Sequence, residues 1–454
     1  MNSRFLIHNA IIINEGKVFP GYLTVENGLI ADIGEGTCNS IPFFSDNSYN
    51  IIDADQAYLI PGGIDDQVHF REPGLTHKAD IYSESRAAVA GGITSFMDMP
   101  NTVPQTITNE LLMDKHKIAA ETSLANFSFF PGATNNNIKE LLAADPSIIP
   151  GVKVFLGAST GNMLVDQDEA LEAIFRDLPH LIAIHSEYEP VIQANLAHYK
   201  AFYGDDIPIS MHPLIRSTEA CFHSTQKAVA LAKKFGSRLH VLHLSTADEL
   251  GLFDDTALSA QKRITAEACV HHLWFDNSSY DRLGSLIKWN PAIKTAADRE
   301  ALLRGVAGNL IDIVATDHAP HTLEEKSKAY NQCPSGAPAI QHSLLLMFEL
   351  SLQGHFPLET VVQKMCHNVA LCFGIEKRGY LRKGYHADLV LVHPAKEWTI
   401  EKKDLHYKCG WSPWEGENLH SKVTHTFVNG NLVYCEGVFN ETIKGKALKY
   451  NGNK

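Results

Sequence analysis

The stretch "AYLIPGGIDDQVHF" at residues 57–70 is an apolar run that ends in polar side chains. If its second half forms a β-strand, Asp65, Gln67 and His69 share one face, because the side chains of a strand alternate between its two sides. A single histidine on such a face is weak evidence of a site. The remainder of the chain therefore decides whether this run begins the fold of an active site.

Seven further β-like runs follow, and helical segments separate them. The eight runs occupy residues 57–70, 92–100, 126–131, 150–157, 181–187, 238–246, 263–272 and 312–321. Helical patterns are clear in "HKADIYSESRAAVAGG" (77–92), "DEALEAIFRDL" (168–178) and "STQKAVALAKKFG" (224–236). We expect the first of these helices to stop at Gly91-Gly92. Eight β-runs that alternate with helices predict an α/β fold, namely a TIM-like (β/α)8 barrel.

The two ends of the chain have a different pattern, with short β-runs and tight turns. Asn27-Gly28 lies between two β-rich runs near the start, and Asn429-Gly430 lies between two near the end. An Asn-Gly pair in this position is a strong hairpin signal. We therefore predict a small β-sandwich built from both termini, with the domain limits 1–58, 59–378 for the barrel, and 379–454.

Composition excludes several classes of protein. The chain has 454 residues, of which 44% are hydrophobic and 20% charged, with a formal net charge of -13. Without a basic stripe, this charge argues against nucleic acid as a partner. No apolar run reaches membrane-spanning length, and the start "MNSRFLIHNAIIINEG" has no signal-peptide pattern, so we expect no membrane partner. The eight cysteines are scattered without a CxxC pair, which predicts reduced thiols and a cytoplasmic protein.

Chemically active side chains lie at or near the C-terminal ends of several runs. In a parallel barrel these ends open on one face, where such barrels carry their active sites. The side chains with ligand chemistry are His69, His185, His243 and Asp317. Neutral imidazole and carboxylate suit zinc or a similar divalent ion. The pattern thus predicts a metal site, in which His185 and His243 can hold one ion, and His69 and Asp317 another.

Lys153 lies inside the fourth run, between Val152 and Val154. A lysine among apolar neighbours is costly if it is charged and unpaired, so its pKa should fall. The neutral amine could then react with carbon dioxide, and the resulting carbamate has the shape to bridge two cations. Alternatively, the ammonium group reaches a carboxylate such as Asp317. Residue chemistry alone leaves these alternatives open.

Other polar residues are candidates for contacts with a small-molecule substrate. These candidates are Arg71, Asn101, Asn290 and His321. Arg71 offers a planar fork for a carboxylate. Asn101 in "PNTVP", and Asn290 before Pro291, have an equally good explanation as turn residues. The segment "NQCPSGAPAIQHS" (331–343) is expected to supply backbone contacts.

Several motifs, in order along nearly the whole chain, are similar to those of the dihydroorotase family in the amidohydrolase superfamily. They include "PGGIDDQVHFREPG" (61–74), "AGGITSFMDMPNTVP" (90–104), "VKVFLGASTGNM" (152–163), "AIHSE" (183–187), "HVLHLST" (240–246), "TAEACVHHL" (265–273), "KWNPAIKTAADREAL" (288–302) and "ATDHAPHTLEEK" (315–326). "GYLRKGYHADLVLV" (379–392) resembles the C-terminal sandwich signature. Single motifs are shared with hydantoinases and allantoinases.

The resemblance implies a role for each candidate residue. His69 would bind a first zinc ion and His185 and His243 a second, with Lys153 as a carboxylated bridging ligand. Asp317 would bind the first ion and act as the catalytic base and acid. The remaining candidates would hold the substrate: Arg71, Asn101, Asn290 and His321. The implied reaction is the reversible interconversion of N-carbamoyl-L-aspartate and L-dihydroorotate in pyrimidine biosynthesis, and the resemblance is compatible with a homodimer.

Gln67 departs from the family pattern, because it occupies the first histidine of a His-x-His motif. An amide oxygen is a poor zinc ligand beside imidazole, so the first ion should bind more weakly. The sequence leaves open whether one ion or two are bound, and whether Gln67 is itself a ligand. Two rival functions also stay open: a hydantoinase or allantoinase activity, and a catalytically impaired homologue that acts as a structural partner of another pyrimidine enzyme.

Overall fold

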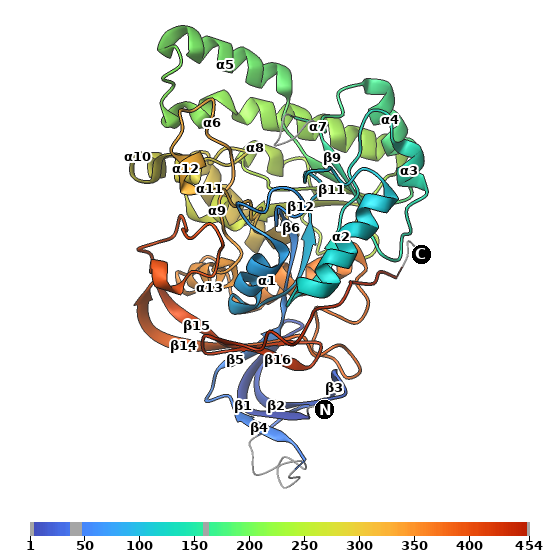
Figure 1. Ribbon diagram of the computed structural model, residues 1–454, viewed down its shortest axis with the longest axis vertical. Coiled ribbons are helices and arrows are strands. Elements are labelled where there is room, and N and C mark those ends of the chain that lie inside the picture. Colours follow the sequence, from blue (N-terminus) through green and yellow to red (C-terminus); the bar gives the residue numbers. More distant parts are fainter. Residues whose placement is uncertain (1–3, 37–47, 158–162, 452–454) are drawn as a thin grey trace.

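The computed structural model describes residues 4–36, 48–157 and 163–451, which form a barrel that stands on a broad β-sheet (Figure 1). The barrel strands follow the predicted runs in order. They are β6 (Gly63–Val68), β7 (Ile93–Asp98), β8 (Asn126–Phe129), β9 (Val152–Phe155), β10 (Ile182–His185), β11 (Leu239–Val241), β12 (Ile264–Cys269) and β13 (Ile313–Ala315). All neighbours among them pair in parallel.

The eight strands form two sheets, β6-β7-β8 and β9 to β13, whose edges meet at two seams. At one seam, Val68 and His318 form a parallel bridge, and His69 N donates to the carbonyl of His318 at 2.7 Å. At the other, Gly132 and Lys153 form a parallel bridge, and Lys153 N donates to the carbonyl of Pro131 at 2.9 Å. The predicted (β/α)8 barrel is confirmed, and its carboxyl ends open on one face.

Helices surround these strands and connect them. They are α1 (Ile81–Ala90), α2 (Asn109–Thr122), α3 (Ile138–Leu142), α4 (Asp168–Asp177), α5 (Glu189–Tyr203), α6 (His212–Ile215), α7 (Thr218–Phe235), α8 (Ala247–Leu250), α9 (Val270–Trp274), α10 (Tyr280–Leu283), α11 (Ala296–Ala307), α12 (Leu323–Lys326), α13 (Ser343–Leu352), α14 (Leu358–Val362) and α15 (Asn368–Phe373). Short 3-10 or π turns lie at Ile209–Met211, Asn277–Ser279, Gly284–Ile287, Gln363–His367 and Lys402–Asp404. No described helix is both long and apolar enough to cross a bilayer.

The three helices expected from the sequence are present, with ends set by capping. Helix α1 begins after Asp80, whose side chain accepts a hydrogen bond from Ser83 N at 2.7 Å, and ends at Gly91 as expected. Helix α7 starts six residues earlier than the predicted segment, because Ser217 caps it by accepting from Ala220 N. It ends at Gly236, which has φ +70° and so adopts the left-handed conformation that glycine tolerates best.

The sheet below the barrel has nine strands and combines both ends of the chain. Its strands are β1 (Phe5–Asn14), β2 (Lys17–Glu26), β3 (Leu29–Glu35), β4 (Asn50–Asp53), β5 (Tyr58–Pro61), β14 (Leu389–Thr399), β15 (Asn418–Val428), β16 (Asn431–Cys435) and β17 (Val438–Phe439). Antiparallel pairing of β5 with β14 joins the two ends. Buried side chains of β1, β2, β5 and β14 form a separate core. The domain boundaries expected between residues 58 and 59, and between residues 378 and 379, stay predictions.

The run at residues 57–70 does not form one strand. It divides at Gly62, so that β5 pairs with β14 in the lower sheet and β6 pairs with β7 in the barrel. A Cβ atom at Gly62 would lie 2.1 Å from Thr94 Oγ1, so only glycine fits where the chain passes from one sheet to the other. This division places the polar end of the run inside the barrel.

Candidate active site

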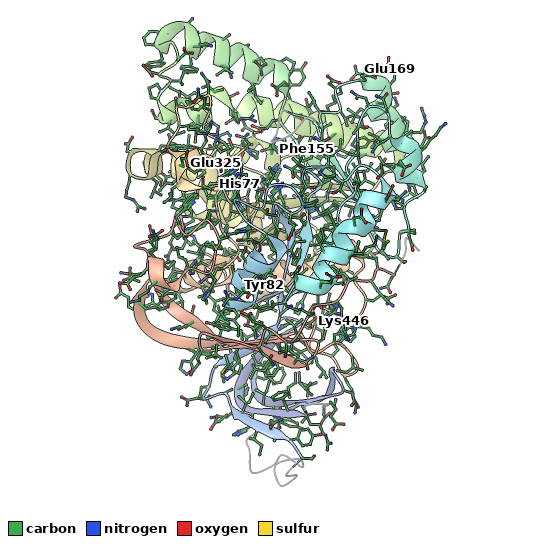
Figure 2. The ribbon with its side chains drawn as sticks, viewed as in Figure 1. His77, Tyr82, Phe155, Glu169, Glu325 and Lys446 are labelled. Atoms are coloured by element: carbon green, nitrogen blue, oxygen red, sulfur yellow. The ribbon has the colours of Figure 1, made fainter. Side chains whose placement is uncertain are left out.

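The carboxyl ends of the barrel strands surround a pocket. Its lining consists of Gln67, His69, Arg71, Asn101, Lys153, Phe155, His185, His243, Asn290, Asp317, Ala319, Ser335 and Gly336. Phe155, labelled in Figure 2, lies in the half of the barrel that faces away from the nine-stranded sheet. Every predicted site residue except His321 therefore lines a single pocket.

His69 and Asp317 form the first pair of candidate ligands. His69 donates from Nδ1 to Asn101 Oδ1 at 2.7 Å, which directs the lone pair of Nε2 at Asp317 Oδ1, 3.1 Å away. A lone pair that faces a carboxylate oxygen needs a cation or a proton between them. Gln67 is close to the same place, because its Nε2 donates to Asp317 Oδ1 at 3.3 Å. The amide of Gln67 therefore lies beside the place of the first predicted ion, for which the sequence predicts that Gln67 is a weak ligand or none.

His185 and His243 form the second pair, with His185 Nδ1 and His243 Nε2 only 2.9 Å apart. His185 donates from Nε2 to Glu187 Oε2 at 3.0 Å, an outer contact that metal-binding histidines usually make. Burial lowers the pKa of both imidazoles, so they are neutral and have lone pairs to offer. This chemistry fits a divalent cation held between the two rings.

Lys153 lies in the same pocket and is only 1% exposed. Burial lowers its pKa to about 7. Among the described residues, no carboxylate oxygen lies within 4.0 Å of its Nζ, so the ion pair with Asp317 considered above does not form in this structure. The nearest aromatic ring is that of Phe155, whose centroid is 4.8 Å from Nζ. The amine is thus buried beside both candidate ligand pairs, and no described side chain of opposite charge pairs with it.

Arg71 is a buried cation that lines the wall of the pocket. Its Nε donates to the carbonyl of Pro320 at 3.1 Å, and one terminal nitrogen lies 3.0 Å from His321 Nε2. No described carboxylate forms a salt bridge with the guanidinium, and burial lowers its pKa to about 10. Because a buried cation without a counterion is costly, this group is suited to an anionic ligand.

His321 lies behind Arg71 instead of in the pocket lining, and its side chain is fully buried. Its Nδ1 faces Lys78 Nζ at 3.1 Å, and Lys78 in turn pairs with Glu325 at 2.9 Å. Figure 2 shows Glu325 next to His77 at the edge of this group. A direct contact between His321 and a substrate stays a prediction; the structure brings His321 to Arg71.

Asn290 and the loop at residues 330–336 form the opposite wall. Asn290 Oδ1 has no hydrogen-bond partner among the described residues, so it can accept from a ligand. Two buried lysines hold the loop through its carbonyl groups. Lys288 Nζ donates to Tyr330 and Cys333, and Lys326 Nζ donates to Pro334 and Gly336. The loop expected to supply backbone contacts therefore lines the pocket with Ser335 and Gly336.

Three site residues have left-handed backbone conformations, with φ of +66° at Arg71, +43° at His243 and +45° at Asp317. Positive φ is uncommon outside glycine and often occurs at functional sites. Each follows closely after a barrel strand, so the turn redirects the side chain into the pocket.

The alternation of side chains expected for β6 breaks down at Asp65, which therefore does not share the pocket with Gln67 and His69. The register of β6 shifts after Asp65, and its carboxyl group accepts from Thr316 Oγ1 at 2.6 Å, outside the pocket.

Two further side chains of the pocket region, Glu187 and Phe155, have little signal in the sequence. Glu187 holds His185 and also pairs with Arg216; although burial opposes it, these partners lower the pKa of Glu187 to about 2. In the sequence, the position of Glu187 two residues after His185 in "HSE" is the feature that could have indicated this contact. Phe155 lines the pocket two residues after Lys153. Its apolar side chain has no signal that separates a pocket residue from a core residue.

Comparison with known proteins agrees with this geometry. Residues 58–433 match the model of the Amidohydrolase family. Among curated proteins, the chain is 30% identical to the dihydroorotase of Methanosarcina acetivorans over 99% of this chain and 96% of that protein. It is 35% identical to the dihydroorotase of Halobacterium salinarum over 84% and 88%. An allantoinase of Bacillus velezensis is 28% identical over 95% and 94%.

Solved structures also resemble this one. The L-hydantoinase (dihydropyrimidinase) from Arthrobacter aurescens superposes with a TM-score of 0.89, at 25% identity and 97% coverage of both chains. A D-hydantoinase superposes with a TM-score of 0.88 at 21% identity over the whole of both chains, which supports the fold alone. The chain thus shares its fold with proteins named hydantoinase and is similar in sequence to proteins named dihydroorotase and allantoinase.

Proposed function

Because the chain belongs to the amidohydrolase family and is a cyclic amidohydrolase, we propose that it is a dihydroorotase. It would interconvert L-dihydroorotate and N-carbamoyl-L-aspartate in pyrimidine biosynthesis. The observation that supports this choice over hydantoin or allantoin is the buried Arg71, which lines the pocket without a carboxylate partner among the described residues. Dihydroorotate carries a carboxylate that would complete this pair.

We propose that the pocket holds zinc and that Lys153 is N-carboxylated. His69 and Asp317 would hold one ion, His185 and His243 would hold the other, and the carbamate on Lys153 would bridge them. The buried amine of Lys153, which pairs with no described carboxylate, supports this assignment. As an ammonium group it would be a buried cation without a counterion, whereas as a carbamate it would be an anion beside two cations. Zinc in such a site acts as a Lewis acid and makes water easier to deprotonate.

The chain's own groups then divide the work of hydrolysis. Arg71 binds the carboxylate of the substrate, and Asn101 and Asn290 orient the ring, so that its amide carbonyl faces the ligand pairs. Asp317 takes a proton from the attacking water at Oδ as the new C–O bond forms, and delivers it to the ring nitrogen as the C–N bond breaks. His321 acts through Arg71, which it contacts at 3.0 Å.

The direct test compares dihydroorotate with dihydrouracil, which has the same ring but no carboxylate. We expect hydrolysis of dihydroorotate and at most slow hydrolysis of dihydrouracil, hydantoin and allantoin. Efficient turnover of dihydrouracil or hydantoin, without turnover of dihydroorotate, would contradict the proposal. An absence of turnover on all four ring compounds, by zinc-loaded protein, would favour the alternative of a structural partner.

Arg71→Gln should raise KM for dihydroorotate by about 10- to 100-fold, because it removes hydrogen bonds to a charged group worth about 1.5–3 kcal/mol. The matched control is dihydrouracil, whose residual hydrolysis should not change, since it has no carboxylate to lose. Steady-state kinetics of both compounds with both proteins measure this. An equal loss on both compounds would mean that Arg71 supports the pocket and does not bind the carboxylate.

Gln67→His should increase zinc affinity at the first site by at least about tenfold, because imidazole is a better zinc ligand than an amide oxygen. Competition with a chromogenic chelator measures this affinity. Gln67→Leu is the control, since it removes the donor atoms at similar volume and should leave the affinity unchanged or lower. If histidine and leucine have the same effect, position 67 does not face the ion.

A cytoplasmic location and a homodimer are also proposed. The seven cysteines that the structure describes are all free thiols, which is compatible with a reducing compartment. The homodimer rests on the resemblance alone.

A further inference from the structure

A second group of ligand-type side chains lies in the barrel interior, outside the pocket. It consists of Asp66 on β6, His240 on β11 and Glu267 on β12, each with 0% exposure. One atom from each lies within 4.8 Å of the other two. Glu267 Oε1 accepts from His243 N at 3.0 Å, so this interior cluster lies one layer beneath the second ligand pair. None of the three residues lines the pocket.

The spacing of the interior cluster fits a bound cation. His240 Nε2 is 3.2 Å from Asp66 Oδ2 and 3.5 Å from Glu267 Oε2. Neither contact has hydrogen-bond geometry. Ligands at about 2.0–2.2 Å from a tetrahedral zinc ion are about 3.3–3.6 Å apart, which is close to the distances of 3.2 and 3.5 Å observed for two of the three pairs.

The tautomer of His240 points to the same conclusion. Thr265 Oγ1 lies 2.8 Å from His240 Nδ1 and 3.3 Å from the carbonyl oxygen of Leu239, so it can accept from Nδ1 while it donates to Leu239. Although burial opposes it, contacts with Asp66, Cys372 and Glu267 raise the pKa of His240 well above its usual value, so a bound cation would have to displace the proton on Nε2. With the Nδ1 proton donated to Thr265, the lone pair of Nε2 would then face both carboxylates. Metal-binding histidines are typically held in this way by a hydrogen bond from their second nitrogen.

The carboxylates lack other partners. Both oxygens of Asp66, and Oε2 of Glu267, have no hydrogen bond among the described residues. Glu267 Oε1 has two, from His243 N and from the thiol of Cys269 at 3.5 Å. Two carboxylates buried together are expensive. Burial raises the pKa of Glu267 to about 8, so when no cation is bound a proton on Glu267 and the imidazolium of His240 balance the charge. A divalent cation would balance the charges of both carboxylates, and the carboxylate oxygens that have no hydrogen bond could bind it.

We propose that Asp66, His240 and Glu267 hold a divalent transition-metal ion, with zinc as the ion that fits their donors, in addition to any ion in the pocket. The ion has a structural role, because no ligand is exposed and no substrate can reach it. Asp66 belongs to the three-stranded sheet and the other two ligands to the five-stranded sheet. The ion therefore links the two sheets across the barrel and is trapped when the barrel closes.

Anomalous diffraction at the zinc edge tests this on crystals of the full chain grown with zinc. We expect a peak about 2.0–2.3 Å from His240 Nε2, Asp66 Oδ2 and Glu267 Oε2, separate from any peak in the pocket. Density in the pocket without a peak in the interior cluster would overturn this proposal and leave the proposed function intact. A water molecule in place of the ion, or no density between the three side chains, would overturn it equally.

Metal analysis of variants gives an independent measurement. Asp66→Asn should lose one equivalent of zinc per chain after exhaustive dialysis against chelator, which removes exposed ions but not the trapped one. Glu249→Gln is the matched control, because Glu249 is a buried carboxyl whose oxygens accept from Thr225 and Thr246 instead. It should retain the full zinc content. Equal zinc in wild type and Asp66→Asn would overturn the proposal; if that variant does not fold, the diffraction result on the wild type decides.

Discussion

Replacing Asp317 by asparagine should lower kcat for dihydroorotate hydrolysis by about 10²- to 10⁴-fold, which is the usual contribution of general acid–base catalysis. The amide cannot take a proton from water or deliver one to the ring nitrogen. It keeps an oxygen that can face His69 Nε2, which is 3.1 Å from Asp317 Oδ1 in the present structure. The loss should therefore appear in kcat more than in KM, and steady-state kinetics in both directions of the reaction measure it.

The backbone makes asparagine the informative substitution. Asp317 has φ +45°, a conformation that asparagine adopts far more readily than most residues. Asp317→Asn should thus keep the melting temperature of the wild type. Asp317→Ala is the comparison, because it should add backbone strain to the chemical loss and lower the melting temperature as well. Wild-type turnover in Asp317→Asn would remove this residue from proton transfer.

Removal of the Lys153 side chain should have the second large effect. In Lys153→Ala we expect a loss of at least about 10³-fold in kcat/KM, together with the loss of zinc from the pocket, because the ligand pairs would lack their bridging anion. Lys153 is 1% exposed, so the deletion leaves a closed space beside both pairs. A small carboxylate such as acetate or propionate has the shape of the lost carbamate and should restore part of the activity. Zinc content and turnover with and without added acetate measure both effects.

Two controls separate the carbamate from a general effect of a buried lysine. Lys364 is also buried, and its Nζ donates to Asn309 Oδ1 and to the carbonyl of Ile311. Lys364→Met should change stability but neither zinc content nor the response to acetate. Zinc-free wild type should regain activity faster in bicarbonate than in bicarbonate-free buffer. Full reactivation without any carbon dioxide would exclude the carbamate.

Much of the fold could be predicted, because local patterns determine it. The alternation of β-runs with helices predicted eight barrel strands, and each run contains one. The Asn-Gly pairs at residues 27–28 and 429–430 predicted turns, and both pairs have the positive φ that such turns need. The division of the first run at Gly62 could not be predicted, because it depends on Thr94, a residue of the next strand.

The site was predictable in its residue types but not in its contacts. Local chemistry indicated His69, His185, His243 and Asp317 as candidate ligands, a role that stays a prediction, and the structure brings all four to one pocket. It did not show that His321 would lie behind Arg71, or that Asp65 would turn away from the pocket to Thr316. Both outcomes depend on a register shift or a turn at the end of a strand.

The sequence by itself determined which chemical groups the protein has, and in what order its strands and helices follow one another. Only the tertiary structure decided which groups meet. His69 and Asp317 are 248 positions apart, and they touch because the first and last barrel strands bridge at Val68 and His318. The same closure places Arg71 where no carboxylate of the described residues pairs with it, and it gathers Asp66, His240 and Glu267 in the interior. Distances between residues so far apart are set by the closure of the barrel, because no local preference of the chain specifies them.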